Sequence, residues 1–142
     1  VVAGSGNPKD IQINSPTVQN NTHFIGVIKN MSKLYPVADT LIHPTLGDTY
    51  GMVVLEAMSH KLPVIVSSAK YCGFSEHLSS EEAIILDNPR SSKEISKNIE
   101  LLNNQPELHN KISENGSKKS KKISWNSALK STIQVYKQID SR

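Results

Sequence analysis

The sequence predicts an α/β fold, in which a Rossmann-like parallel sheet is flanked by helices and followed by a helical C-terminal tail. Two apolar segments of strand length, residues 40–43 and 63–68, enclose residues 51–58, which have the composition of a helix. Met, Leu, Glu and Ala favour helix, and this segment is too long and too apolar for a surface loop. A strand, a loop with glycine, a buried helix and a second strand therefore follow one another.

The segments before this unit predict two further strands. Residues 1–3 form an apolar run that leads into glycines, and residues 23–26 are expected to be a strand that ends in a turn. Residues 10–21 are polar and interrupted by Pro16, which predicts one short helix or a loop. Residues 31–37 predict a short helix whose last turn is irregular or newly started, because Pro36 removes a backbone donor there.

The segments after this unit predict a last strand and mainly helices. A short helix is expected from Phe74 and a strand over residues 83–86. An amphipathic helix follows over residues 92–103, and Pro106 opens another at its first turn, where proline is tolerated. A third helix is predicted over residues 125–139. Its start has a suitable N-cap in Ser124. The apolar stripe of this third helix consists of Leu129, Ile133 and Tyr136.

Length and composition indicate one globular domain. We expect a sheet and crossover core over residues 1–90 and C-terminal helices over residues 91–142. The single cysteine, Cys72, excludes an internal disulfide and offers no metal-binding cluster. No apolar run approaches the ~20 residues of a membrane span.

The formal charge of +3 arises locally from Lys118, Lys119, Lys121 and Lys122. These lysines have no interleaved aromatic or Arg residues, which favours a solvated helix face over a nucleic-acid site. Attraction to an anionic membrane surface is the other interpretation, at ~1 kcal/mol for each basic residue.

The start of the central helix predicts an anion site. In an open parallel sheet the carboxyl ends of the strands face a crevice, and the next helix presents unpaired backbone N–H groups there. The N–H groups of Gly51, Met52 and Val53 are therefore expected to bind phosphate, which the helix dipole favours. Gly51 lets a ligand approach the backbone closely.

Two acids bracket this helix start. Asp48 lies in the loop, and Glu56 lies within the helix, eight positions later. Glu56 is surrounded in sequence by apolar residues, so we expect that its carboxylate is not freely solvated and needs a partner. Either protein groups hydrogen-bond to it, or it accepts hydroxyl protons from a polyhydroxylated ligand.

The segment Gly4-Ser5-Gly6 follows the first strand and is typical of the start of a dinucleotide fingerprint. The third glycine of that fingerprint is absent, and no convincing helix follows, so the signal is weak. An NAD-type dinucleotide-binding domain stays open as an alternative on this segment alone.

The segment from Asp48 to Met58, together with Leu62-Pro63-Val64-Ile65, resembles the signature of the group-1 retaining nucleotide-sugar glycosyltransferases, which have the GT-B architecture of two Rossmann-like domains. Their pattern is an acid, seven residues, then Glu in a Leu-Glu-Ala context, followed by Gly-x-Pro-Val. His43-Pro44 and residues 72–78 are most similar to the lipopolysaccharide core glucosyltransferases within that family. The resemblance covers residues 1–88 well and the C-terminal helices more loosely.

The resemblance implies roles for individual residues. Asp48 would contact hydroxyls of the donor sugar, and Glu56 would hold the ribose hydroxyls. Backbone amides of residues 51–53 would meet the diphosphate, and Val27 and Ile28 the nucleobase. The donor-binding set is Gly4, Gly6, Val27, Ile28, Pro44, Asp48, Gly51, Met52, Val53 and Glu56.

This sequence departs from the family pattern at two places. The first acid is usually Glu, so Asp48 is one methylene shorter, which implies a different sugar or a loop that comes closer. His60 and Lys61 stand where the family has a small residue and Gly. That change affects the helix C-cap, because the left-handed position there prefers Gly.

The resemblance implies the donor-binding C-terminal half of an enzyme that transfers a hexose from a nucleoside diphosphate sugar, with UDP-hexose as the expected donor, to a glycan or lipid-linked acceptor. No metal or other cofactor and no nucleic-acid partner are expected. We expect the chain to be a fragment, inactive alone and preceded by the acceptor domain. The expected location is cytoplasmic or peripheral at the inner face of the membrane. A non-catalytic glycosyltransferase-like binding module is the alternative.

Overall fold

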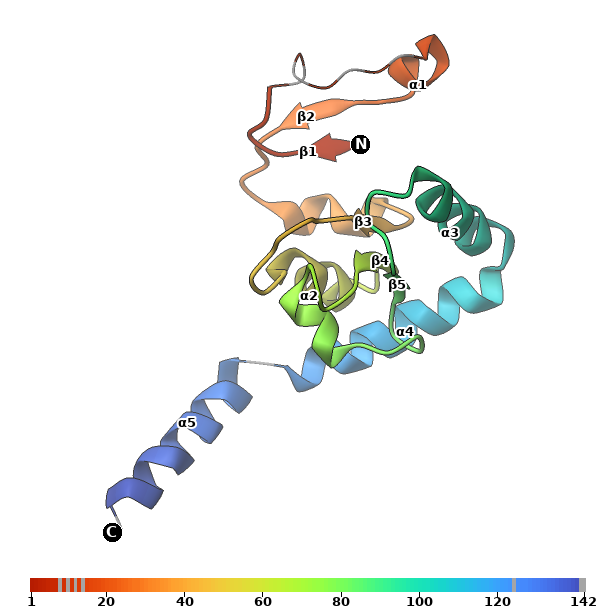
Figure 1. Cartoon of the computed structure of the whole chain (residues 1–142). Coiled ribbons are helices and arrows are strands. Elements are labelled where there is room, and N and C mark those ends of the chain that lie inside the picture. The colour runs from red at the N-terminus through yellow and green to blue at the C-terminus, as the bar shows by residue number, and fades with distance from the viewer. Residues whose placement is uncertain (8, 10, 12, 14, 124, 141–142) are drawn as a thin grey trace. The chain divides into compact units, whose positions relative to one another are not determined.

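The computed structural model describes residues 1–7, 9, 11, 13, 15–123 and 125–140. It forms two compact units, Val1–Leu34 and Tyr35–Arg142, called unit 1 and unit 2 below (Figure 1). Each unit holds its own parallel sheet. The N-cap predicted at Ser124 lies outside the described residues.

Unit 1 contains the first two predicted strands. β1 (Val2–Ala3) pairs in parallel with β2 (Phe24–Gly26), and α1 (Pro16–Asn20) lies between them in sequence. Pro16 starts this helix rather than interrupting it, because the first helical position needs no N–H donor. The unit ends in the short 3₁₀ helix η2 (Met31–Lys33).

Unit 2 is built on a sheet of three parallel strands. These are β3 (Leu41–His43), β4 (Val64–Ser67) and β5 (Ile84–Leu86), in the spatial order β3-β4-β5. Their register pairs His43 with Val66 and Ser67 with Leu86, so the carboxyl ends of all three strands lie at one edge. The sequence predicted each strand to within two residues at either end.

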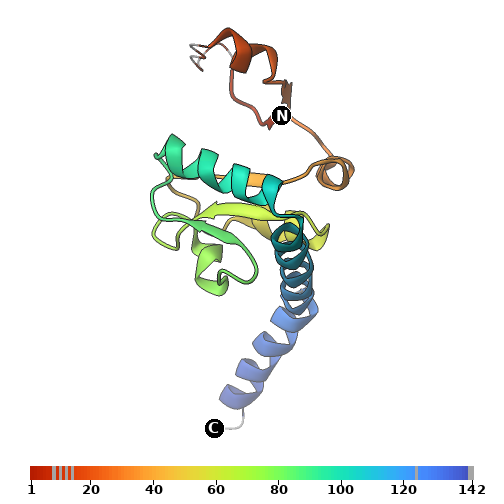
Figure 2. The same cartoon turned by 90° about the vertical axis from the view of Figure 1, so that its right-hand side faces the viewer.

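Three α-helices of unit 2 pack on or beside this sheet. α2 (Met52–Ser59) connects β3 to β4 and contacts both strands, and α3 (Ser92–Asn104) runs along β4 and β5 (Figure 2). α4 (Pro106–Lys122) packs against α2 and α3. Two 3₁₀ helices, η3 (Tyr35–Val37) and η4 (Gly73–His77), complete the connections. The late Pro36 thus divides the short helix predicted over residues 31–37, and a new turn starts at Tyr35.

The core of unit 2 is centred on β4. All four residues of this strand are fully buried. Because successive strand side chains point to opposite faces, both faces of the sheet are covered. On one side Ile65 belongs to a buried cluster with Leu86 of β5, Leu102 of α3 and Ile112 of α4.

The ends of the helices follow the local chemistry of the sequence. Ser91 caps α3, because its Oγ accepts a hydrogen bond of 3.1 Å from the Glu94 N–H. At the end of α2, Lys61 takes a left-handed conformation with φ 59°, at the position where the family pattern has Gly. Its carbonyl accepts a hydrogen bond of 2.6 Å from Ser113 of α4, which fastens this strained residue to the helix beside it.

α5 (Trp125–Asp140) presents its predicted apolar stripe to solvent. Leu129, Ile133 and Tyr136 are all exposed, as are the neighbouring Val135 and Ile139. Among the described residues, no helix combines the length and apolar character needed to cross a membrane.

We predict that Ile112→Ala lowers the free energy of unfolding by about 2–5 kcal/mol, because it removes methylenes from a side chain that is only 1% exposed and leaves a cavity. Urea denaturation followed by circular dichroism measures this change. Ile99→Ala on α3 is the matched control, since Ile99 is 38% exposed and its loss should cost about 1 kcal/mol or less. Equal costs at both positions would contradict the assignment of the core.

Candidate functional site

The loop between β3 and α2 is fastened to the loop after β4. The Asp48 N–H donates to the Tyr71 carbonyl at 2.8 Å, and the Gly73 N–H donates to the Asp48 carbonyl at 3.1 Å. Asp48 and Cys72 thus form an isolated parallel bridge. The Phe74 N–H adds a hydrogen bond of 2.7 Å to the Tyr50 carbonyl. The pairing of β3 with β4 therefore resumes beyond the ends of the strands and fixes the loop that leads into α2.

Ser67, at the end of β4, fixes the start of the same loop. This residue is fully buried, and its Oγ donates to the Thr45 carbonyl at 2.7 Å. Its own carbonyl accepts a hydrogen bond of 2.7 Å from Ser75 Oγ in η4. Pro44, a predicted donor-binding residue, directly follows β3 at this edge and is exposed.

The Asp48 carboxylate is held by three protein groups. Its Oδ1 accepts the N–H groups of Gly51 at 2.7 Å and Tyr50 at 3.2 Å. Its Oδ2 lies 3.0 Å from Nε2 of His43, which donates to it from the end of β3. His43 is therefore a hydrogen-bonded, half-buried residue at the end of β3.

These hydrogen bonds shift the pKa of Asp48. Partial burial by itself raises the pKa of this carboxyl, but hydrogen bonds from His43 and from the Gly51 and Tyr50 N–H groups outweigh it. The net result is a pKa below the ordinary value. Asp48 is therefore ionised at neutral pH and carries its negative charge beside the start of α2.

Gly51 has a conformation that only glycine adopts readily. It is the N-cap of α2 and has φ 82°, in the left-handed region. A Cβ atom at this position would lie 2.5 Å from the Sγ of Cys72. From the sequence, we explained the glycine at position 51 by the close approach of a ligand. The structure shows that the fold itself requires glycine there. At Gly73 a Cβ would likewise collide, there with the Thr49 carbonyl.

The three predicted phosphate-binding amides are not equivalent. The Gly51 N–H already donates to Asp48, so it is engaged within the protein. The N–H groups of Met52 and Val53 open the first turn of α2, where a helix supplies no acceptor of its own. Met52 is exposed and Val53 is half-buried. The helix start therefore offers two amides to an anion and not three.

Glu56 lies on the exposed face of α2. Its Oε2 accepts a hydrogen bond of 3.0 Å from the hydroxyl of Tyr35. The expectation that its carboxylate is shielded from water is wrong, although the expected partner exists. The buried residues Val54, Ala57 and Met58 recur at helical spacing on one face, and Glu56 falls on the opposite one. Sequence reasoning gave no role to Tyr35, and no local signal marks it as the partner.

Four predicted site residues lie in unit 1. Gly4 donates its N–H to the Gly26 carbonyl at 2.9 Å, and both glycines have positive φ. A Cβ at Gly4 or Gly6 would meet no atom within 4 Å, so the backbone there is open. Val27 is exposed and Ile28 is half-buried. These residues share the C-terminal ends of β1 and β2, and the roles predicted for Gly4, Gly6, Val27 and Ile28 stay predictions.

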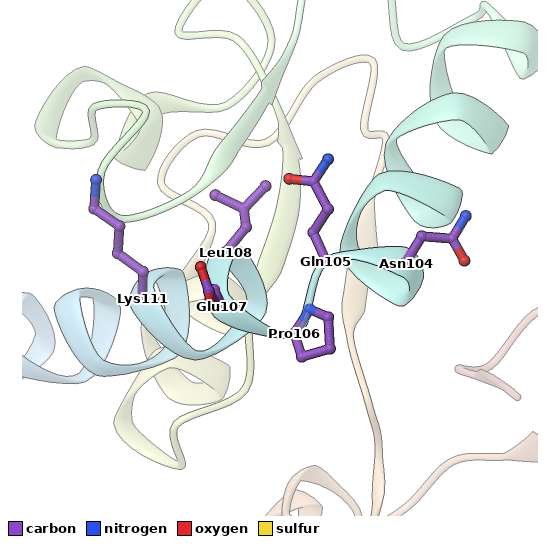
Figure 3. A pocket seen from close by; sticks show the side chains of 6 residues that line it. All are labelled: Asn104, Gln105, Pro106, Glu107, Leu108 and Lys111. Carbon is purple, nitrogen blue, oxygen red and sulfur yellow. The ribbon is translucent and has the colours of Figure 1, made fainter.

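A concavity lies at the turn between α3 and α4, away from the start of α2 in the sequence (Figure 3). It is an open depression of about 720 Å³. Its lining residues are Asn104, Gln105, Pro106, Glu107, Leu108 and Lys111. None of the predicted donor-binding residues belongs to it. The Nζ of Lys111 instead forms an ion pair of 2.8 Å with Glu81. In the described part of the chain, no three His, Cys, Asp or Glu side chains are grouped to bind a metal ion.

Comparison of the sequence with known proteins identifies the family, and comparison of the structure with solved structures identifies the fold. The sequence profile of the family Glycosyl transferases group 1 matches residues 1–119. The glycosyltransferase MJ1607 of Methanocaldococcus jannaschii is 30% identical over 143 residues, which cover 96% of this chain and 36% of that protein. The lipopolysaccharide glucosyltransferase WaaG of Escherichia coli is 27% identical over 99 residues, which cover 69% of this chain and 26% of WaaG.

Two solved structures have the same fold. The crystal structure of WaaG superposes with a TM-score of 0.74 at 24% identity, covering 84% of this chain and 32% of that one. HepE of Anabaena, solved in complex with UDP, gives a TM-score of 0.73 at 19% identity, covering 89% of this chain and 34% of that one. The chain thus spans about a third of the length of the proteins it matches.

We predict that Gly51→Ala lowers the free energy of unfolding by about 2–4 kcal/mol, since an L-residue at this φ is strained and its Cβ meets Cys72 Sγ. Chemical denaturation measures the change. Gly47→Ala in the same loop is the matched control, because a Cβ there meets no atom within 4 Å. If both variants were equally stable, the fixed conformation of Gly51 would be contradicted.

We predict that Asp48→Asn lowers the free energy of unfolding at neutral pH by about 1–2 kcal/mol, a modest loss because 31% of the Asp48 side chain is exposed. The folded pKa lies below the unfolded value, so the stabilisation is complete above the unfolded pKa of ~3.9 and is lost as the pH falls through the folded pKa.

Urea denaturation at a series of pH values from neutral to strongly acidic measures this dependence. The difference in the free energy of unfolding between the native protein and Asp48→Asn should become smaller toward acid pH. Asp39→Asn is the control, because the hydrogen bonds that Thr40 and His109 make to Asp39 in the described part of the chain go to its backbone carbonyl and not to its carboxylate. A difference that stays constant with pH would show that the carboxylate charge is not the stabilising feature.

Proposed function

Because the chain belongs to the glycosyl transferases group 1 family, we propose that it binds the nucleoside diphosphate of a sugar donor. In this proposal it is the donor-binding half of a retaining glycosyltransferase. The observation that carries the proposal is the start of α2. There, free amides open a helix at the carboxyl edge of a parallel sheet, and the acids Asp48 and Glu56 flank them. This is the place where open α/β sheets bind ligands.

The diphosphate would bind to the first turn of α2. The N–H groups of Met52 and Val53 are directed out of the helix start, and the helix dipole places partial positive charge there. Asp48 offsets part of this positive potential. Its charge is in turn balanced by hydrogen bonds from His43, Tyr50 and Gly51. We therefore expect phosphate binding by this chain alone to be weak.

Asp48 keeps some capacity to contact a sugar. An ionised carboxylate has about four acceptor positions, and three are used by protein groups. One position remains for a hydroxyl of the donor sugar. Because Asp48 is anchored on three sides, that hydroxyl would be fixed relative to the diphosphate. The shorter side chain of Asp compared with Glu is consistent with a loop that the bridge to Cys72 holds in place.

Glu56 would hold the ribose. Its Oε2 accepts the Tyr35 hydroxyl, and the residue is exposed, so Oε1 would accept hydrogen bonds from the ribose hydroxyls. The chemistry then requires little of the side chains. Backbone amides stabilise negative charge on the departing diphosphate, and fixed hydroxyl contacts orient the sugar as oxocarbenium character develops. The proposal uses no metal or other cofactor.

Donor and acceptor are proposed from the relatives. HepE is solved with UDP, and WaaG is named a lipopolysaccharide glucosyltransferase. These names support a UDP-hexose donor and a glycan or lipid-linked acceptor. We propose that the acceptor site lies in a further domain, because this chain corresponds to 36% of MJ1607 and 26% of WaaG.

We predict that calorimetric titration of this chain detects weak binding of UDP, and that Glu56→Ala reduces the affinity about 10-fold or more, because hydrogen bonds between a charged group and ribose are lost. GDP, ADP and NAD are titrated in parallel. Glu100→Ala on the surface of α3 is the matched control and should leave the affinity unchanged. Binding of NAD without any nucleoside diphosphate would overturn the donor-binding proposal.

A further inference from the structure

Tyr35 is a buried side chain whose polar end reaches the predicted ribose contact. Only 3% of Tyr35 is exposed, and its hydroxyl donates to Glu56 Oε2 at 3.0 Å. Its ring lies 5.3 Å from the ring of His60, measured between centroids. His60 in turn places Nδ1 2.9 Å from the Glu56 carbonyl at the end of α2. Tyr35 is thus wedged against the exposed face of α2 and has little freedom to move.

The hydrogen bond between Tyr35 and Glu56 stabilises the positions of both side chains. A buried hydroxyl is costly without an acceptor, and Glu56 is the acceptor that the structure provides. Burial, followed by the hydrogen bond and the negative charge of Glu56, raises the pKa of Tyr35 well above its usual value. The hydroxyl therefore remains a proton donor throughout the physiological range, and its donation to a carboxylate is charge-assisted.

This contact decides how Glu56 presents its second oxygen. An exposed glutamate ordinarily samples many rotamers, and binding a ligand then requires that freedom to be lost. With Oε2 held by Tyr35, the carboxylate is fixed before a ligand arrives. We propose that Tyr35 is a positioning residue that orients Glu56 toward the ribose diol and so makes the site selective for ribonucleotides over deoxyribonucleotides. This inference rests on the proposed function, because it takes Glu56 as the ribose contact.

The inference predicts that Tyr35→Phe weakens ribose recognition alone. In the native protein, calorimetry should give an affinity for UDP about 10-fold higher than for 2′,3′-dideoxy-UDP, which lacks both hydroxyls. Tyr35→Phe should reduce the affinity for UDP several-fold and leave that for the dideoxy analogue unchanged, so the ratio falls. Tyr136→Phe on α5, where the side chain is 70% exposed, is the matched control and should keep the native ratio.

A structural role alone gives a different result. If Tyr35→Phe only loosens the fold, both ligands lose affinity by the same factor and the ratio stays native, which would overturn the inference. Thermal unfolding without ligand measures any such loosening separately. Glu56→Gln and the double variant close a mutant cycle. If Tyr35 acts through Glu56, then Tyr35→Phe has no further effect on the ratio once Glu56 is Gln.

Failure of the proposed function has its own signature. If the native protein binds UDP and its dideoxy analogue equally, or if Glu56→Gln leaves a native ratio, then Glu56 is not the ribose contact and both proposals fall. The same holds if the native protein binds neither ligand. If the ratio depends on Glu56 but not on Tyr35, the proposed function stands and only the positioning role is overturned.

Discussion

The candidate site depends on the parallel pairing of β3 with β4 and on its continuation beyond both strands. The bridge between Asp48 and Cys72 holds the connecting loop against η4, and buried Ser67 fixes the start of that loop. Without this second connection, the segment from Pro44 to Gly51 would be an ordinary surface loop. With it, the left-handed turn at Gly51 and the first turn of α2 have defined positions at the carboxyl edge of the sheet.

The electrostatics of the helix start result from two opposing contributions. The first amides of α2 make this end positive, and Asp48 places a negative charge next to them. Hydrogen bonds from His43 and two backbone N–H groups stabilise that charge, so the carboxylate orders the loop without abolishing the attraction for an anion. The same acid therefore serves the fold and, in the proposed function, the sugar. Glu56 likewise has two roles: it accepts the Tyr35 hydroxyl within the fold and, in the proposed function, it binds the ribose.

The family signature is thus partly a description of the fold. Gly51 is required by its own φ and by the sulfur of Cys72, before any ligand is considered. At the end of α2, Lys61 stands where the family has Gly and adopts a left-handed conformation. Its carbonyl accepts a hydrogen bond from Ser113, and its Nζ forms an ion pair with Glu114. Motif residues to which the family resemblance assigns substrate contacts are therefore also constrained by packing. Stability and binding therefore need to be measured separately in this loop.

The sequence by itself determined the strands of both parallel sheets, the helices α2 to α5 and the family, because apolar periodicity, helix-start residues and a motif of adjacent residues are all local in the chain. It also marked Asp48 and Glu56. The tertiary structure alone decided that His43 holds Asp48, that Cys72 confines Gly51, and that Tyr35 reaches Glu56. It also turned Glu56 toward solvent, which the apolar composition of α2 had argued against. Gly51 and Cys72, like Tyr35 and Glu56, meet only after the chain has folded back on itself, and no local pattern encodes which distant side chain will occupy that space.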